Sequence, residues 1–358
     1  MRVWLLPVMA SSFSRFPRGG PPGDIAAAQA AMEEELKSQG VQIIRVQPHP
    51  IHYALDSLPV RRAAAAIIRE HSVDFMLGWH QETWLAARLA RRQSVIPGMI
   101  AAGSYGLLDG NRPRLIIHRW LIRRSMQAAD IIFALSNFTK MELISLFGID
   151  EAKIRVAHWG IDPKFLRVPA RVPENHIRRL LFFGKVSHEK GAFDLFEALG
   201  KLAGQGARDW ELRIAGQGKT EAIDRATAQA GIAGQVTHLG FINHAQLMEQ
   251  LAWAQVAILP SHSESFGLAV VEAQAAGLPV IACNVGAMPE IIVPGETGWL
   301  APARDSAALA AAIAAALESP EQTHRMGLAG RARVEKLFSW EQTANGMLAG
   351  LQEAARGG

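Results

Sequence analysis

Two glutamates in the second half of the chain are the residues best suited to chemistry. Glu264 stands in a loop after an apolar run that ends at Pro260, and Glu272 follows inside a nearly all-apolar segment. An unpaired carboxylate would be costly in such a segment, so we expect Glu272 to bind a polar group. Its two oxygens can accept hydrogen bonds from a vicinal diol, such as the hydroxyls of a ribose.

The residues between these glutamates predict the start of a helix near Phe266, which ends where Gly277 follows. Ser265, Phe266 and Gly267 would then contribute backbone N–H groups that have no partner within the helix. Such N–H groups and the helix dipole together favour an anion, and a diphosphate would fit there. The simpler alternative is that the Glu264 carboxylate only complements this dipole and that Glu272 is a solvated helix residue.

A second group of candidates is the segment Gly184-Lys185-Val186-Ser187-His188-Glu189-Lys190-Gly191, which follows a predicted strand. Lys185 and Lys190 could both neutralise a diphosphate leaving group, although two lysines in a loop are also ordinary surface residues. The chain contains no Asp-x-Asp triplet, so we expect neither a metal nor another cofactor. The two lysines and the helix N-terminus would supply the positive charge instead.

Glycines follow two further predicted strands. Gly216 and Gly218 form a Gly-x-Gly pair, but the third glycine of a dinucleotide-binding fingerprint is replaced by Glu221, which argues against a dehydrogenase. The glycines are better explained as places where the backbone approaches a nucleotide. A base could lie against Gly240 and Phe241 in the same way.

A repeating pattern of strands and helices must position these segments. In the first half, strands are predicted at 41–46, 73–77, 131–135 and 154–157, and helices at 24–36, 59–71 and 82–92. A further helix, capped near Ser136 or Asn137, is predicted to follow the strand at 131–135. In the second half, strands at 179–183, 211–215, 236–239, 256–259 and 279–283 alternate with helices at 193–204, 219–231, 245–254, 266–276 and 306–318. This pattern predicts two tandem Rossmann-like, doubly wound α/β domains with an interdomain cleft at the carboxyl ends of their strands. The proline-containing segment 162–175 marks the boundary, which gives domains at 1–168 and 169–338 and a last helical segment at 339–358.

The composition is that of a globular protein, with 49% apolar and 20% charged residues. Cys283 is the only cysteine, so a disulfide within the chain is impossible and a cytoplasmic location is expected. The first residues, Met1–Ser11, have features of a signal peptide, but a buried first strand is preferred because a helix signal follows at once. No apolar stretch is long enough to span a bilayer.

The positive charge is concentrated in the first half, where residues 1–170 carry 21 Lys and Arg against 14 Asp and Glu. Residues 112–124 combine five arginines with apolar side chains at helical spacing, and Arg88, Arg91 and Arg92 form another cluster. Peripheral contact with anionic lipid at the inner face of the membrane is one interpretation, and an ordinary solvated basic helix is the other. No motif indicates binding to nucleic acid.

Taken together, these motifs resemble glycosyltransferase family 4, a retaining family with the GT-B fold. The matching segments of the second half are Gly184-Lys185, Lys190-Gly191, Ala215-Gly216-x-Gly218, Leu239-Gly240-Phe241, Pro260-Ser261, the Glu264 and Glu272 pair, 286–290 and 295–298. The first half matches more loosely, through Gly19-Gly20, Ser136-Asn137-Phe138-Thr139 and His158-Trp159-Gly160-Ile161-Asp162.

The resemblance implies a role for each matching residue. Catalysis would depend on Glu264, at the transferred sugar, and on Lys190 and Lys185, at the departing diphosphate. The donor would also be bound by Glu272, Ser265, Phe266, Gly267, Gly216, Gly240, Phe241 and Gly20. Domain 1–168 would bind the acceptor and domain 169–338 the donor, and the last helix would cross back to the first domain. A first-domain histidine that many relatives carry is absent after Pro97, and His80 either replaces it or is a loop histidine beside two tryptophans.

The expected function is retaining, metal-independent transfer of a hexose from a UDP- or GDP-sugar. The acceptor would be a hydroxyl of a glycan or a lipid-linked glycan in the synthesis of cell-envelope polysaccharide or lipopolysaccharide. Two alternatives remain open, namely a sugar-nucleotide epimerase or hydrolase on the same fold and a non-catalytic subunit that binds sugar nucleotides.

Overall fold

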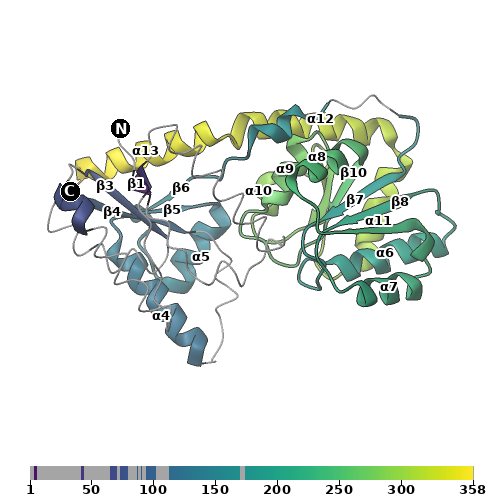
Figure 1. The fold of residues 1–358 in the computed structure, drawn as a ribbon, viewed down its shortest axis with the longest axis horizontal. Helices are drawn as coiled ribbons and strands as arrows, with labels where there is room; N and C mark the ends of the chain where they lie inside the picture. The colour runs from purple at the N-terminus through teal and green to yellow at the C-terminus, as the bar shows by residue number, and fades with distance from the viewer. Residues whose placement is uncertain are drawn as a thin grey trace. The chain divides into compact units, whose positions relative to one another are not determined.

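The computed structural model describes residues 4–5, 42–43, 65–70, 73–79, 87, 90, 94–101, 113–169 and 174–357. The chain divides into two compact units, which Figure 1 shows as ribbons. Unit 1 comprises Met1–Ala134, Lys140–Val156 and Met347–Gly358, and unit 2 comprises Leu135–Thr139 and Ala157–Gly346. The predicted domain ends at 168 and 338 both lie within unit 2.

Unit 1 contains a parallel sheet with the strand order β3-β4-β5-β6. Its strands are β3 (Phe75–Trp79), β4 (Ile96–Ala101), β5 (Ile131–Ala134) and β6 (Ile154–Val156). Two short strands, β1 (Trp4–Leu5) and β2 (Gln42–Ile43), form a second parallel pair. The helices predicted at 24–36 and 82–92 lie outside the described residues, apart from Ala87 and Ala90.

Helices α4 (Pro113–Ala128) and α5 (Asn137–Phe147) share an apolar core with this sheet. Buried side chains such as Met126 and Phe147 pack there against the strands. Helix α13 (Trp340–Gly357) contributes its last residues to unit 1, where Gly350 lies against Phe133. Arg155 and Glu353 form an ion pair of 2.7 Å in the same unit.

Unit 2 contains a six-stranded parallel sheet with the order β12-β11-β10-β7-β8-β9. Its strands are β7 (Arg179–Phe183), β8 (Glu211–Ala215), β9 (Val236–Gly240), β10 (Val256–Leu259), β11 (Val280–Cys283) and β12 (Gly298–Ala301). The order reverses between β7 and β10, as in a doubly wound sheet. Both units therefore have the parallel α/β architecture that the sequence predicts.

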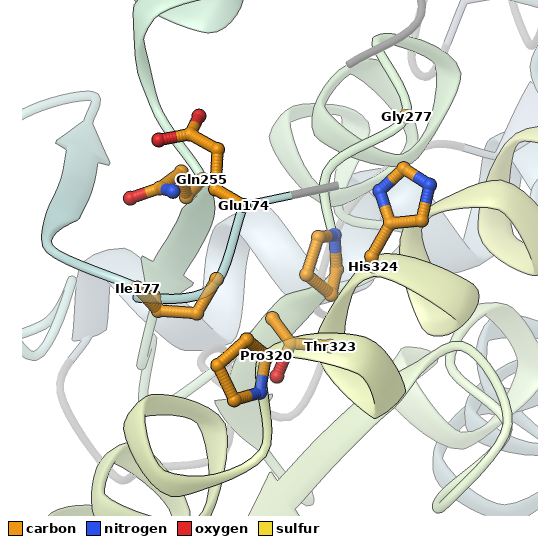
Figure 2. Close-up of a pocket in the computed structure, with 8 residues that line it drawn as sticks. Glu174, Ile177, Gln255, Gly277, Pro320, Thr323 and His324 are labelled. Atoms are coloured by element: carbon orange, nitrogen blue, oxygen red, sulfur yellow. The ribbon is translucent and has the colours of Figure 1, made fainter. Parts of the chain in front are cut away.

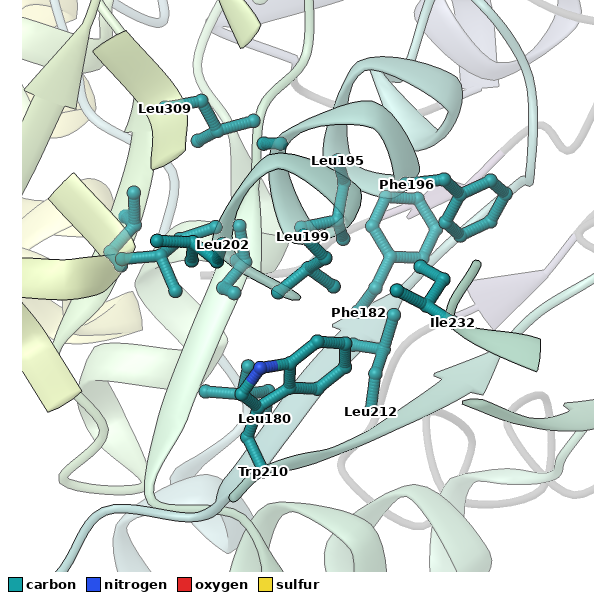
Figure 3. Close-up of a cluster of buried hydrophobic side chains, with 14 of the residues drawn as sticks. Leu180, Phe182, Leu195, Phe196, Leu199, Leu202, Trp210, Leu212, Ile232 and Leu309 are labelled. Atoms are coloured by element: carbon teal, nitrogen blue, oxygen red, sulfur yellow. The ribbon is translucent and has the colours of Figure 1, made fainter. Parts of the chain in front are cut away.

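Helices cover both faces of this second sheet (Figure 1). They are α6 (Ala192–Gly204), α7 (Thr220–Gln229), α8 (His244–Trp253), α9 (Leu268–Ala275), α10 (Met288–Ile291), α11 (Ser306–Glu318) and α12 (Pro320–Leu337). Figure 3 shows the core on one face, where Leu180 and Phe182 of β7 pack against Leu199 of α6 and Leu309 of α11. These side chains are almost fully buried, so the strands are held firmly beneath the loops that follow them.

The structure differs from the predicted elements in a few places. Helix α9 begins at Leu268 rather than near Phe266, because Gly267 has a φ of +87° and occupies the N-cap position. Strands β4 and β12 and helices α10 and α12 have no predicted counterpart. No helix among the described residues is long and apolar enough to cross a bilayer.

Candidate functional site

The loops after β7, β8 and β9 lie next to one another at the carboxyl edge of the unit 2 sheet. The N–H of Gly184 donates to the carbonyl of Ala215 at 2.9 Å, and the N–H of Gly216 donates to the carbonyl of Gly240 at 2.7 Å. His238 adds a contact of 3.0 Å between its Nε2 and the Gly216 carbonyl. The predicted glycines are therefore neighbours along one edge, where ligands of open α/β sheets bind.

The lysine loop also meets the segment that carries Glu264. Lys190 Nζ lies 2.5 Å from Glu264 Oε1, and both side chains are partly buried. Gly191 has a φ of +68°, and a β-carbon there would overlap the Pro260 carbonyl. The N–H of His262 donates to the backbone carbonyl of Glu189 at 2.8 Å. Main-chain contacts thus hold the cation and the carboxylate together, although they are far apart in the sequence.

The backbone after Glu264 presents open hydrogen-bond donors. The N–H groups of Ser265, Phe266, Gly267 and Leu268 have no acceptor among the described residues. The Phe266 side chain is 3% exposed and packs on Phe338, so this residue can offer a ligand only its main chain. Four open N–H groups in sequence at the start of a helix form a site suited to an anion.

Glu272 lies in the second turn of α9 and is partly buried. Val271 and Ala273 on either side of it are 0% exposed. Most of the other residues of this helix are buried, namely Val270, Val271, Ala273, Gln274 and Ala275.

The other predicted residues are placed less tightly. Lys185 is exposed and has no ion pair with a described residue. Phe241 is 42% exposed beside Gly240, whose φ is +68°. Gly20 and His80 lie outside the described residues, so their predicted roles stay predictions.

Two polar clusters beside these residues were not predicted from the sequence. In the first, His262 Nε2 lies 2.6 Å from Asp194 Oδ2 in the first turn of α6. The thiol of Cys283 donates to the Pro260 carbonyl at 3.3 Å. Burial, with the negative charge of Asp194, raises the pKa of Cys283 to about 12, so this thiol stays protonated and has a structural role.

The second cluster lies at the N-terminus of α5, whose first turn belongs to unit 2. Glu290 Oε2 accepts from the N–H of Asn137 at 2.8 Å and Oε1 accepts from the N–H of Phe138 at 2.7 Å. Burial acts to raise the pKa of Glu290, but these hydrogen bonds and the nearby His158 outweigh it, and the pKa is lowered. Both Asn137 and Glu290 stand in motifs of the resemblance, which gave neither a role.

A small cavity lies at the opposite edge of the same sheet (Figure 2). Its lining includes Ile177, Gln255 and Pro279, which precede β7, β10 and β11, together with Thr323 and His324 of α12. Its volume of about 20 Å³ is enough for a water molecule but not for a substrate. The candidate site is therefore the carboxyl edge of the sheet.

Comparison with known families matches both halves of the chain. The family "Glycosyl transferases group 1" matches residues 171–333, which include every described candidate residue of the carboxyl edge. The "Glycosyltransferase Family 4" matches residues 20–165. The two matches together cover most of the chain.

Individual relatives are named as sugar-transferring enzymes. The chain is 33% identical over 278 residues to the glycogen synthase of Mycobacterium tuberculosis, across 74% of this chain and 66% of that protein. It is 32% identical over 238 residues to the D-inositol 3-phosphate glycosyltransferase of Streptomyces scabiei, across 61% of this chain and 53% of that protein. The chain thus spans between half and two thirds of the length of these relatives.

Solved structures confirm the GT-B fold. HepE of Anabaena, in complex with UDP-glucose, superposes with a TM-score of 0.69 over 91% of this chain and 88% of its own, at 18% identity. At that identity the likeness concerns the fold alone. With both halves matched by family and the fold shared, the chain belongs to glycosyltransferase family 4.

Proposed function

We propose that this chain transfers a hexose from a nucleotide-diphosphate sugar to an acceptor hydroxyl, with retention of configuration and without a metal. The observation that carries the proposal is the pairing of Lys190 with Glu264 beside the open N–H groups that precede α9. Cations and oriented N–H groups stabilise the negative charge that develops on a departing diphosphate. No other part of the described chain combines these features.

Each group has a chemical task in this proposal. Lys190, assisted by Lys185, neutralises the diphosphate as the bond to the sugar breaks, and the N–H groups of Ser265 to Leu268 hold its oxygens. Glu264 lies within reach of the transferred sugar and stabilises its positive charge. Glu272 accepts hydrogen bonds from the ribose hydroxyls. The acceptor oxygen bonds to the anomeric carbon from the face that the departing diphosphate leaves, which retains the configuration, and its proton passes to the departing phosphate oxygen.

The donor is a UDP- or GDP-sugar. The fold shared with a protein that binds UDP-glucose supports this class. A thermal-shift series with UDP-, GDP- and ADP-glucose tests it, because a ligand that binds only the folded chain raises Tm. A rise with UDP- or GDP-glucose, unchanged by EDTA, supports the proposal. No rise with any nucleotide sugar contradicts donor binding, and a rise that EDTA removes contradicts the metal-independent mechanism.

The acceptor is a glycan or lipid-linked glycan of the cell envelope. Helix α4 supports a lipid surface, since Ile116, Ile117 and Trp120 are 53%, 60% and 48% exposed. Arg123 and Arg124 are exposed on the same helix, and the Arg124 guanidinium lies 5.3 Å from the Trp120 ring centroid. Exposed apolar side chains among arginines suit the interface of an anionic membrane. Co-sedimentation with anionic but not neutral vesicles at low salt is expected, and no sedimentation with either contradicts this contact.

Catalysis is distinguished from simple binding by release of nucleotide. Purified protein is incubated with UDP-glucose and GDP-mannose, with and without a glycan acceptor, and free UDP or GDP is measured. Release that an acceptor accelerates supports transfer. Release that no acceptor changes indicates a hydrolase, and binding without release indicates a non-catalytic subunit.

A further inference from the structure

The peptide groups that join Glu264 to Ser265 and Ser265 to Phe266 are both fixed by hydrogen bonds to their carbonyl oxygens. The carbonyl of Glu264 accepts the N–H of Ala287 at 3.2 Å. The carbonyl of Ser265 accepts the hydroxyl of Ser136 at 2.7 Å, and the hydroxyl of Thr139 lies 3.4 Å from the same oxygen. Both carbonyls therefore have a fixed direction.

The direction of a carbonyl determines the direction of the next N–H. In a trans peptide group the C=O and N–H point to opposite sides, and the described peptide bonds are all trans. The Glu264 carbonyl shares its peptide group with the N–H of Ser265, and the Ser265 carbonyl shares its own with the N–H of Phe266. The N–H of Phe266 is thus turned away from Ser136, toward the side where no described acceptor lies.

The hydroxyl of Ser136 donates its proton to the Ser265 carbonyl and accepts a hydrogen bond from another group. Ser136 is 0% exposed, and its oxygen accepts the N–H of Thr139 at 3.0 Å as the N-cap of α5. A hydroxyl has one proton to donate, and the Ser265 carbonyl is its nearest acceptor, closer than the Thr139 hydroxyl at 3.0 Å. A buried hydroxyl that accepts from one segment and donates to another fixes both.

The position of Ser136 is itself secured by Glu290. The two carboxylate oxygens bind the next two N–H groups of α5, those of Asn137 and Phe138. The guanidinium of Arg333 donates to the Glu290 carbonyl at 2.8 Å. Glu290 thus connects the turn that carries Ser136 to the helices of unit 2.

We propose that Ser136 is a positioning residue for the donor diphosphate, because its bond to the Ser265 carbonyl orients and polarises the N–H of Phe266. This inference rests on the proposed function, in which that N–H binds the donor. Preorganised donors contribute to binding because they need no reorientation when the anion arrives. Ser136 touches no part of the substrate in this account.

The test separates phosphate binding from nucleoside binding. Calorimetry gives the Kd of UDP and of uridine for the wild type and Ser136→Ala, or of GDP and guanosine if guanine is the preferred base. The Kd of the nucleoside divided by the Kd of the nucleoside diphosphate measures how much the diphosphate adds to the affinity. Ser136→Ala is expected to lower this ratio by about three- to tenfold, the effect of one hydrogen bond, and to leave nucleoside binding unchanged.

Thr323→Val is the matched control. The buried Thr323 hydroxyl also donates to a carbonyl, that of Ala316 at 2.9 Å, and lines the cavity at the other edge of the sheet. Its loss should lower stability without changing the ratio. If Ser136→Ala does not fold, Ser136→Cys keeps the size of the side chain with a weaker donor and is measured instead.

The outcomes distinguish this inference from the proposed function. If the wild type binds neither diphosphate better than its nucleoside, the proposed function fails. If the wild type shows the gain and Ser136→Ala or Ser136→Cys keeps all of it, the role of Ser136 is wrong. An equal loss in Thr323→Val would assign the effect to stability and would also overturn the inference.

Discussion

The N-termini of α5 and α9 both present backbone N–H groups that need acceptors from outside the helix, but only those of α5 have such acceptors in the described chain. At α5 the first three N–H groups are all satisfied, those of Asn137 and Phe138 by Glu290 and that of Thr139 by Ser136. At α9 the N–H groups that precede the helix have no described acceptor. A helix N-terminus attracts an anion in both cases. One end is closed by a carboxylate of the chain itself, and at the other we propose that an external diphosphate binds.

This difference distinguishes a helix end with a structural role from the end that we propose as a binding site. The Glu290 carboxylate accepts the first two N–H groups of α5, so these donors already have a partner within the chain. The corresponding carboxylate near α9, Glu264, is paired with Lys190 at 2.5 Å instead of binding the N–H groups. The pair places a cation near the open N–H groups, and in the proposed function both stabilise the negative charge of the diphosphate.

Removal of the cation is the strongest test of the open end. Lys190→Ala is expected to lower kcat by about 100- to 1,000-fold, as loss of a group that stabilises transition-state charge does. Steady-state rates of sugar transfer measure this. Lys201→Ala is the matched control, because Lys201 of α6 pairs with Glu197 at 3.0 Å and has no place in the proposed chemistry. Unchanged turnover in Lys190→Ala would remove this lysine from the mechanism.

Neutralising Glu290 tests the closed end and should act on stability. Glu290→Gln places an amide against two N–H donors and removes a carboxylate from a helix N-terminus, so the free energy of unfolding should fall by about 1–3 kcal/mol. Urea unfolding followed by circular dichroism measures it. The control is Glu341→Gln in the first turn of α13, an exposed residue for which less than about 0.5 kcal/mol is expected. Equal effects of the two substitutions would contradict the comparison.

The smallest expected effect is the loss of the stabilisation by Glu290 at low pH. The folded-state pKa of Glu290 is lowered, so its stabilisation is fully present above the unfolded value of about 4.3 and is lost as pH falls through the folded value. The difference in Tm between wild type and Glu290→Gln should therefore shrink as the pH is lowered from about 6 toward 3. A difference that stays constant over this range would show that charge is not the source of the stabilisation.

The sequence predicted the strands of unit 2 well where the signal is local, while the roles of the site residues stay predictions. Apolar runs and the glycines after them predicted β7 to β11. The spacing of Glu264 and Glu272 predicts the donor segment. Helix α12 was missed because Gly327 and Gly330 interrupt its pattern. Both glycines lie against the turn and helix around Gly277, a close packing that no local pattern reveals.

The supporting contacts could not be predicted because they join distant parts of the chain. Ser136 and Ser265 are separated by 129 positions, and Asn137 and Glu290 by 153. The resemblance marked these residues as parts of motifs, but only the structure shows which oxygen accepts which N–H. It also shows why α9 begins later than expected, since Gly267 takes the cap position with a positive φ.

A crystal structure of the chain with UDP or GDP, whichever raises Tm more, tests the central claim most directly. The account predicts the diphosphate at the start of α9, with its oxygens at about 2.7–3.2 Å from the N–H groups between Ser265 and Leu268. Lys190 Nζ should contact it, while Glu290 remains on the first turn of α5. A diphosphate bound elsewhere, or one that displaces Glu290 from α5, would contradict the account.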